Sequence, residues 1–230
     1  MTDAMKVLER TVNGRAIHRR HHVKSDGRDL LLYGYHPHTL PRVEGEDLQT
    51  LTGSELRWHP LRGDWSINAA ARQNRTFTPS AAENPFEDFE LAVFKNRFPS
   101  LHSDAHEPNT PGLKMHSAKG ACEVIVYSPE AQGSLATLGQ ARRRLLVAAW
   151  IDRYDALYES GCAFVLPFEN RGDEVGVTLH PPHGQIYGFP IVPRPQVFAA
   201  AAFEEGYDLA AEVKDWGAAD RIAEACGLCS

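Results

Sequence analysis

The sequence predicts an α+β fold in which helices pack on one face of an antiparallel sheet. Short segments separated by turn residues fill the first half, and this pattern is typical of strands joined in hairpins. Two long segments with helical spacing follow in the second half. The chain has 230 residues, of which 43% are hydrophobic and 23% charged. It therefore has the composition of an ordinary globular protein and is long enough to bury a core.

The strands of the first half are located by their turns. Residues 15–24 and 29–35 flank the turn Ser25-Asp26-Gly27-Arg28, and they predict one hairpin. Residues 55–58 and 65–69 flank a Pro-Leu-Arg-Gly-Asp turn, and they predict a second hairpin.

Loops and strands alternate after these hairpins. Residues 78–89 are rich in Pro, Ala and acidic residues, so they predict a surface loop. A strand is predicted over residues 90–95. Residues 102–119 carry Pro, Gly and three His, and they predict another loop. The run Cys-Glu-Val-Ile-Val-Tyr at residues 122–127 predicts a strand that stops before Ser-Pro.

The second half contains the two predicted helices. Helical spacing of apolar residues covers residues 134–159, and Gly161 is expected to end that helix. Strands are predicted over residues 162–168 and 184–192. Residues 196–225 have an Ala-rich start and are expected to be mostly helical.

Composition excludes several classes of protein. The net charge of −6 argues against a protein that coats nucleic acid or an anionic membrane. The four Cys are too few for a disulfide framework, and we interpret the pair Cys226 and Cys229 as incidental. The N-terminus has no apolar region typical of a signal peptide, and no apolar stretch is long enough to span a membrane. We therefore expect a cytoplasmic protein.

The densest candidate for chemistry is the segment Thr-Leu-His-Pro-Pro-His-Gly-Gln-Ile-Tyr at residues 178–187. Beyond the two prolines, His183 and Gln185 should share one face of an extended segment. A neutral imidazole can attack phosphorus, and an amide can donate a hydrogen bond to a phosphate oxygen. The alternative is a surface loop with a stray His, but the neighbouring Gly, Pro and Gln are not a combination that simple packing needs.

Five segments, in chain order over about residues 55–192, together resemble one known family. They begin with the early hairpin, a pair of Arg residues and a Phe-containing strand. A central strand and the His183 segment complete the set. In order they are His59-Pro-Leu-Arg-Gly-Asp-Trp65, Arg72-Gln-Asn-Arg75, Val93-Phe-Lys-Asn-Arg-Phe-Pro99, Gly120-Ala-Cys-Glu-Val-Ile-Val-Tyr-Ser-Pro129 and Phe168-Glu-Asn-Arg-Gly through Tyr187. The family they resemble is galactose-1-phosphate uridylyltransferase, of the histidine-triad superfamily.

The resemblance implies a fold and a reaction. A histidine-triad-like domain would cover residues 1–195, with a helical extension over residues 196–230. His183 would attack UDP-glucose and release glucose 1-phosphate, and galactose 1-phosphate would then displace UMP from the histidine. Gln185 resembles the family's phosphate-contacting amide, and it favours transfer over hydrolysis because hydrolases of the superfamily carry a third His there. Since an imidazolium has no free lone pair, uptake of the uridylyl group should rise from acid to neutral pH.

The resemblance also implies seven substrate-binding residues. Two arginines would neutralise the diphosphate, two polar side chains would contact phosphates, and two rings and an amide would form the uridine pocket. In that order, these are Arg72 and Arg75; Asn170 and Thr178; and Phe94, Phe98 and Asn96. Without the resemblance the arginines would be interpreted as a solvated loop and the rings as core residues. For the rings, both interpretations can hold together.

The sequence departs from the family pattern in three places. Pro181 stands where the family motif begins with a His that is a zinc ligand in many members. The family's Cys-x-x-Cys pair is absent between residues 78 and 89, and His106 is one possible remaining ligand. Because one ligand does not make a site, we expect no zinc of the family type. Arg97 stands where some members carry an acidic residue.

Family members contain two similar halves, and the second half completes a dimer. We therefore expect a companion polypeptide that carries the C-terminal half, with UDP-glucose and hexose 1-phosphate as substrates and a possible dimer. Two other functions stay open. One is a nucleotide hydrolase or phosphorylase of the same superfamily, and the other is a non-catalytic nucleotide-binding subunit.

Overall fold

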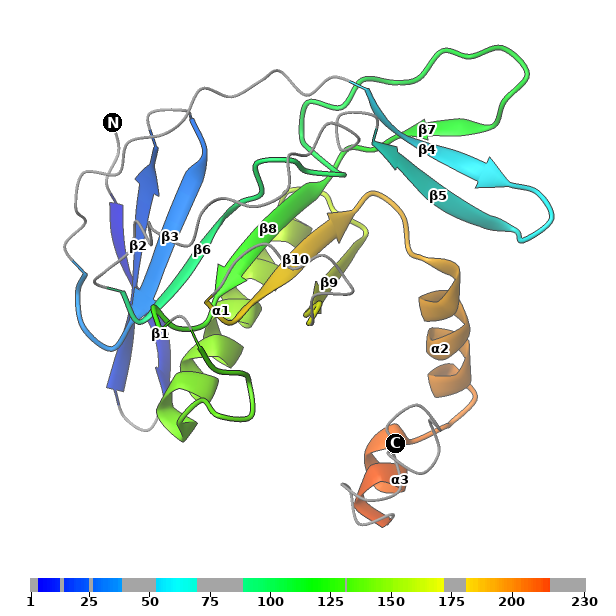
Figure 1. Cartoon of the computed structure of the whole chain (residues 1–230). Helices are drawn as coiled ribbons and strands as arrows, with labels where there is room; N and C mark the ends of the chain where they lie inside the picture. Colours follow the sequence, from blue (N-terminus) through cyan, green and yellow to red (C-terminus); the bar gives the residue numbers. More distant parts are fainter. Residues whose placement is uncertain are drawn as a thin grey trace. The chain divides into compact units, whose positions relative to one another are not determined.

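The computed structural model describes residues 4–12, 15–24, 27–38, 53–69, 89–130, 132–171 and 181–215 (Figure 1). It has two compact units, Met1–Ile191 and Val192–Ser230. The described part of the first unit contains a seven-stranded sheet, a three-stranded sheet and one long helix. The fold consists of antiparallel sheets with few helices, which agrees with the coarse prediction from the sequence.

The seven-stranded sheet holds the residues that matter for function. Its strand order is β1-β2-β3-β6-β8-β10-β9, and every neighbouring pair is antiparallel. The predicted first hairpin is β2–β3, whereas the sequence did not predict β1. In sheet order the strands are β1 (Ala4–Val12), β2 (Arg15–Val23), β3 (Asp29–Gly34), β6 (Leu91–Lys95), β8 (Ala121–Val126), β10 (His183–Phe189) and β9 (Phe164–Phe168).

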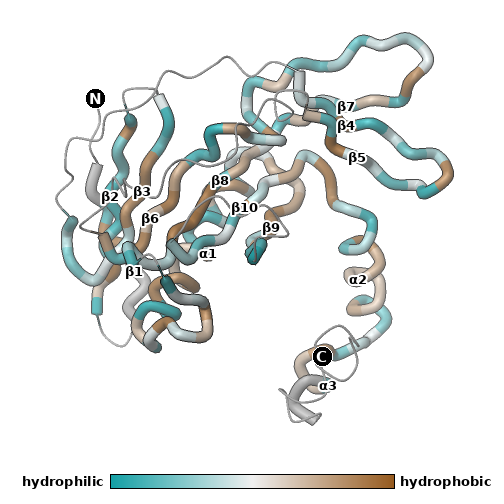
Figure 2. The backbone as a smooth tube through the Cα atoms, viewed as in Figure 1, coloured by the Kyte–Doolittle hydropathy of each residue, from teal (hydrophilic) through white to brown (hydrophobic). Residues whose placement is uncertain are grey.

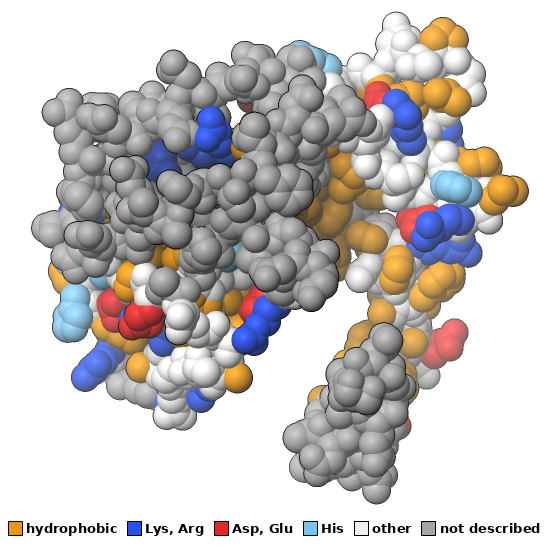
Figure 3. Space-filling model, in the orientation of Figure 1, with side chains coloured by type: hydrophobic (Ala, Val, Ile, Leu, Met, Phe, Trp, Pro, Cys, Tyr) orange, Lys and Arg blue, Asp and Glu red, His pale blue; other side chains and the backbone are white. Residues whose placement is uncertain are grey.

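The three-stranded sheet contains the second predicted hairpin, with strands β4 (Ser54–His59), β5 (Asp64–Ala69) and β7 (Met115–Ser117). Trp58 and Trp65 are opposite each other on β4 and β5, with ring centroids 5.3 Å apart. Figure 3 shows both acidic and basic side chains over this sheet. The strand β7 lies within the predicted loop 102–119, which is therefore only partly a loop.

The long helix α1 (Gln140–Glu159) begins six residues later than the predicted start at residue 134. The backbone N–H of Ser134 donates to Thr137 Oγ1 (2.8 Å), and Thr137 Oγ1 donates back to the Ser134 carbonyl (3.0 Å). These bonds satisfy the backbone N–H and carbonyl of Ser134 in a turn instead of a helix. Short polar side chains compete in this way with the helix for backbone hydrogen bonds. At the other end, Gly161 has a φ of 96°, a conformation that glycine adopts without strain after a helix.

Helix α1 packs on one face of the seven-stranded sheet, which we call the helix face. The strands contribute Val93, Ile125 and Ile186 to this contact, and all three are buried. From α1 itself come Leu145, Leu146, Ala148, Ala149 and Leu157. In Figure 1 the helix lies behind β8 and β10, and Figure 2 shows that the central strands β6 and β8 are mostly hydrophobic.

Side chains alternate along each strand, so the neighbours of the helix-face residues point to the opposite face. That opposite face has its own apolar cluster of Leu30, Leu32, Phe89, Ala92, Val124 and Val126, against which Phe94 packs. The central strands are therefore apolar on both faces, and this explains why β6 and β8 form nearly continuous hydrophobic runs in the sequence.

The second unit contains α2 (Arg194–Glu204) and α3 (Leu209–Asp215). These helices account for the first part of the predicted helical stretch 196–225, whose last residues lie outside the described part, as do Cys226 and Cys229. The packing of α1 on the sheet is observed, whereas the packing of the C-terminal helices on the same face stays a prediction, as does a domain boundary at residue 195. Among the described residues, none of the helices is long and apolar enough to cross a membrane.

Candidate active site on strand β10

The predicted nucleophile, His183, is the first residue of β10. Its Nδ1 lies 2.9 Å from the backbone carbonyl oxygen of Pro181. A carbonyl oxygen only accepts hydrogen bonds, so Nδ1 must carry the proton. In the neutral imidazole the lone pair is then on Nε2. This contact selects the tautomer that a nucleophilic histidine needs.

Gln185 lies on the same face of the sheet as His183. His183 pairs with Val126 and Gln185 pairs with Val124, and both valines belong to the cluster on the opposite face from α1. The prediction that the two side chains share a face is therefore consistent with the observed register.

The Gln185 side chain has an unsatisfied polar end. Its Oε1 is buried and has no hydrogen-bond partner among the described residues. Buried amide groups in proteins nearly always have partners, so this one needs an explanation. A half-turn about the last side-chain torsion exchanges the carbonyl and the NH2 group, which lets the buried end donate to a bound oxygen.

Phe94 lies in the same cross-strand row as Gln185. Phe94 pairs with Val124, which in turn pairs with Gln185. Two strand spacings separate the two backbones, or about 10 Å. Phe94 also packs against the apolar cluster, with the Lys24 ammonium 5.1 Å from the ring centroid. The ring therefore packs in the core, as the sequence allowed, and one strand, β8, lies between it and the candidate phosphate-contacting amide.

Asn96 turns the chain at the end of β6. Its backbone N–H donates to the Cys122 carbonyl (2.8 Å), and its Oδ1 accepts from the backbone N–H of Phe98 (2.9 Å). This side-chain bond closes a turn typical of Asn. The Arg97 guanidinium lies 5.4 Å from the centroid of the Phe98 ring. The three residues predicted for a uridine pocket thus begin on β6 and end in the turn that follows it.

Four other predicted site residues do not belong to this group of described side chains. Asn170 is exposed just after β9. Arg72, Arg75 and Thr178 lie outside the described residues. The structure therefore brings together His183, Gln185 and Phe94, with Asn96 at the end of the same sheet.

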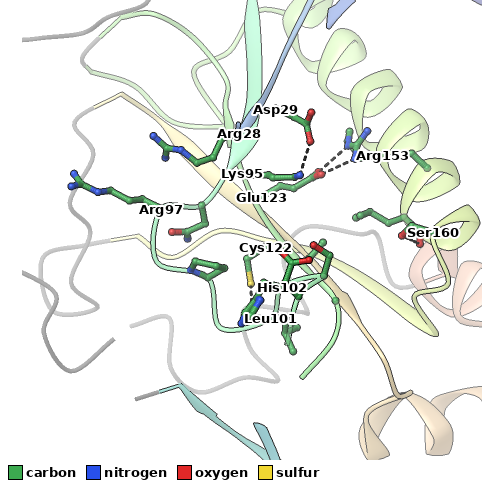
Figure 4. A pocket seen from close by; sticks show the side chains of 18 of the residues that line it. Arg28, Asp29, Lys95, Arg97, Leu101, His102, Cys122, Glu123, Arg153 and Ser160 are labelled. Carbon is green, nitrogen blue, oxygen red and sulfur yellow. Dashed lines mark hydrogen bonds and ion pairs between the residues drawn. The ribbon is translucent and has the colours of Figure 1, made fainter. Parts of the chain in front are cut away.

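A cavity of about 620 Å³ lies beside Asn96, between the loop after β6 and the last part of α1 (Figure 4). Glu123 and Arg153 point toward each other in it and form two hydrogen bonds, of 2.8 and 2.6 Å. Asp29 and Lys95 form a second ion pair at 2.7 Å. Burial alone would raise the pKa of Asp29, but its hydrogen bonds with Lys95 and His21 outweigh burial and lower it. The charges of both carboxylates are therefore compensated within the fold.

The described residues do not fit a metal centre. They contain no group of three or more His, Cys, Asp or Glu side chains that could hold a metal ion. His106, the possible remaining ligand, is exposed in the loop after β6. We therefore derive no step through a metal.

Sequence reasoning missed the importance of a backbone atom at Pro181. The sequence showed the loss of a His side chain there, whereas the structure shows a carbonyl that holds His183. Only the two-residue spacing to His183 could have indicated this contact, since any residue at that position supplies a carbonyl.

Comparison with known proteins gives the family. The family model described as galactose-1-phosphate uridyl transferase, N-terminal domain, matches residues 78–193. This is half of the chain and includes His183 and Gln185. The chain belongs to the galactose-1-phosphate uridylyltransferase family. The resemblance stated from the sequence is thus confirmed.

Individual uridylyltransferases agree with this membership. The galactose-1-phosphate uridylyltransferase of Thermotoga maritima is 35% identical over 166 residues, which cover 67% of this chain and 52% of that protein. The enzyme of the same name from Streptomyces lividans is 37% identical over 180 residues, covering 72% of this chain and 47% of that protein. A solved uridylyltransferase structure superposes with a TM-score of 0.57 at 25% identity, over 70% of this chain and 55% of that one. The chain thus spans about half the length of the uridylyltransferases that it matches.

Proposed function

We propose that this chain carries the nucleophile of a UDP-glucose–hexose-1-phosphate uridylyltransferase, which moves UMP from UDP-glucose to galactose 1-phosphate. The observation that carries the proposal is the contact between His183 Nδ1 and the Pro181 carbonyl. It leaves the lone pair of Nε2 available on the sheet face that also carries Gln185. The names of the family and of the relatives support the substrates.

The proposed reaction has two displacements at one phosphorus atom. In the first, the Nε2 lone pair forms a bond to the α-phosphorus of UDP-glucose, and the bond to the departing glucose 1-phosphate breaks with its electron pair. The uridylyl-imidazole keeps its Nδ1 proton, which the Pro181 carbonyl continues to accept. In the second, a phosphate oxygen of galactose 1-phosphate attacks the phosphorus, and the electron pair returns to Nε2. No proton needs to be gained or lost in either step.

Gln185 is proposed to stabilise the phosphoryl oxygens during both displacements. An amide donor contributes a hydrogen bond without acting as a base toward water, and this favours transfer over hydrolysis. Phe94, Asn96 and Phe98 are proposed to hold the uridine, and Asn170, Thr178, Arg72 and Arg75 to hold the phosphates.

UDP-glucose labelled with ³²P at the α-phosphate tests the proposal. We expect label on the wild-type protein, no label on His183→Ala, and unchanged label on His22→Ala as a control histidine of strand β2. Free UMP without labelled protein would indicate a hydrolase instead. Nucleotide binding with neither label nor UMP would indicate a non-catalytic subunit.

The companion polypeptide stays a prediction, because the relatives contain a second part that this chain does not match. Galactose 1-phosphate added to the labelled chain tests it. We expect slow release of UDP-galactose from the chain alone and faster release when the second half is supplied. A normal rate from the chain alone would show that no companion is needed.

A further inference from the structure

Tyr127 holds the backbone on both sides of His183. It directly follows β8 and is only 1% exposed. Its backbone N–H donates to the carbonyl of Pro182 at 2.9 Å. A Cβ added to Gly184 would lie 2.2 Å from the Tyr127 hydroxyl oxygen and 2.8 Å from the Phe168 carbonyl oxygen. The residue before the nucleophile is thus bonded to Tyr127, and the residue after it lies directly against the phenol.

The phenol is itself paired with a carboxylate. The pKa of Tyr127 is raised well above its ordinary value. Burial is the largest cause, and the interaction with the nearby Glu169 carboxylate adds to it. The phenol is therefore protonated at neutral pH and lies close to the Glu169 carboxylate. The carboxylate oxygen Oε2 of Glu169 is buried and has no hydrogen-bond partner among the described residues.

This pair is not what packing alone requires. Tyr127 belongs to the apolar cluster between α1 and the sheet, where a phenylalanine ring would fill nearly the same space. A buried carboxylate with one oxygen unpartnered is unfavourable unless it has another role. The position of Glu169 indicates a role beside the nucleophile. Glu169 directly follows Phe168 at the end of β9, and the Phe168 carbonyl borders Gly184, the residue after His183.

We propose that the Tyr127–Glu169 pair is a positioning device for His183. From the helix face it fixes the path of residues 182–184, so that the imidazole stays in reach of the Pro181 carbonyl. The two side chains support the first residue of β10 from the face opposite to His183 and Gln185. They do not contact substrate, and they act through the backbone. This inference rests on the proposed function of His183 as nucleophile.

A matched pair of substitutions tests the proposal. Tyr127→Phe removes the hydroxyl and keeps the ring. Tyr33→Phe is the control, because Tyr33 is equally buried on the helix face and donates to Asp152 at 2.6 Å. Tyr33 lies on β3, which two strands, β6 and β8, separate from β10. In single-turnover labelling, we expect Tyr127→Phe to lower the rate constant about tenfold. The final label per chain and the dependence on UDP-glucose concentration should not change, and Tyr33→Phe should stay within about twofold of the wild type.

A purely structural role would give a different pattern. Loss of folded protein lowers the final amount of label and leaves the rate constant of the remaining molecules unchanged. If Tyr127→Phe lowers only the amplitude, or behaves like Tyr33→Phe, the positioning role is wrong.

The ring tautomer of His183 gives a readout that needs no substrate. In ¹⁵N NMR spectra of the full chain we expect the Nδ1–H form to dominate in the wild type and in Tyr33→Phe. The Nε2–H form should gain population in Tyr127→Phe and in Glu169→Gln. Unchanged tautomers would overturn the positioning role. If instead the tautomers shift but even the wild type takes up no label, the proposed function fails and the positioning role stands.

Gly184→Ala supplies an independent check. In the wild-type background the new methyl group meets the phenol oxygen at 2.2 Å, whereas in Tyr127→Phe the Phe168 carbonyl at 2.8 Å and the ring carbon Cζ at 3.2 Å are the contacts that remain. We therefore expect Gly184→Ala to lower the labelling rate by a smaller factor in the Tyr127→Phe background than in the wild type. If Gly184→Ala lowers the labelling rate by the same factor in both backgrounds, the Tyr127 hydroxyl does not constrain the backbone of strand β10.

Discussion

Replacing Arg153 with Met should destabilise the protein strongly, because it leaves Glu123 buried without its partner. The side chains of Glu123 and Arg153 are 7% and 12% exposed, and two hydrogen bonds of 2.8 and 2.6 Å join them. Burial alone would lower the pKa of the Arg153 guanidinium, but the charge and hydrogen bonds of Glu123 raise it. The carboxylate is therefore the dominant electrostatic partner of Arg153.

The magnitude follows from the burial of both partners. Removal of one member of a buried ion pair typically lowers the free energy of unfolding by about 3–5 kcal/mol. With an m-value of roughly 3 kcal/mol per molar urea, the midpoint of urea unfolding should fall by about 1–1.7 M. Replacing both residues with Met should lower the free energy of unfolding by less than about 1 kcal/mol, since neither charge is then left unpaired.

The control is the more exposed pair in the same cavity. The Lys95 and Asp29 side chains are 52% and 34% exposed, so Lys95→Met should lower the free energy of unfolding by about 1 kcal/mol or less. Urea titrations followed by fluorescence compare the three variants with the wild type. The reasoning is refuted if Arg153→Met and Lys95→Met shift the midpoint equally, or if the double replacement is as damaging as Arg153→Met.

Three further predictions concern the site and its surroundings. Gln185→Glu keeps the shape of the side chain but sets an anion toward the phosphates, so the labelling rate should fall about 100-fold; a change under threefold would exclude the proposed contact. Asn96→Ala removes the acceptor for the Phe98 N–H and should lower the Tm by about 3 °C in calorimetry, whereas Asn96→Asp, which keeps the oxygen, should stay near the wild type. The lowered pKa of Asp29 means that its ion pair adds stability above the pKa of the unfolded chain and loses it as the pH falls through the lower, folded pKa. The stability difference between wild type and Lys95→Met should therefore shrink as the pH falls from about 5 to 2, and a constant difference would contradict this assignment.

Local patterns were sufficient to predict much of the fold. The hairpins β2–β3 and β4–β5 follow from turn residues between alternating segments, and the end of α1 follows from Gly161. The start of α1 could not be predicted in this way. Its periodic apolar residues extend back to residue 134, but the Ser134 and Thr137 side chains satisfy the backbone in a turn. The periodicity of apolar residues indicates which side of a helix each residue would face. It does not indicate whether a nearby polar side chain forms hydrogen bonds with the backbone and so prevents the helix.

Contacts distant in sequence could not be predicted from local patterns. The strand β7 is three residues long and exists because it pairs with β4, which lies about 60 residues earlier. Glu123 and Arg153 are likewise 30 residues apart and carry no motif. For the candidate site, alternation along β10 was enough to place His183 and Gln185 on one face. Tyr127 was not foreseen, because its role depends on the space beneath Gly184, which only the folded sheet defines.

Pro181 is the position where sequence and structure lead to opposite expectations. The sequence indicates a lost His, whereas the structure indicates that the group in use is the backbone carbonyl 2.9 Å from His183 Nδ1. Any residue supplies that carbonyl, so Pro181→Ala and Pro181→His should both take up label within about threefold of the wild-type rate. Thermal unfolding of each variant shows whether the fold is intact. A tenfold or greater gain in Pro181→His, with no change in Pro181→Ala, would show that the carbonyl alone is insufficient and that a side chain at this position is needed.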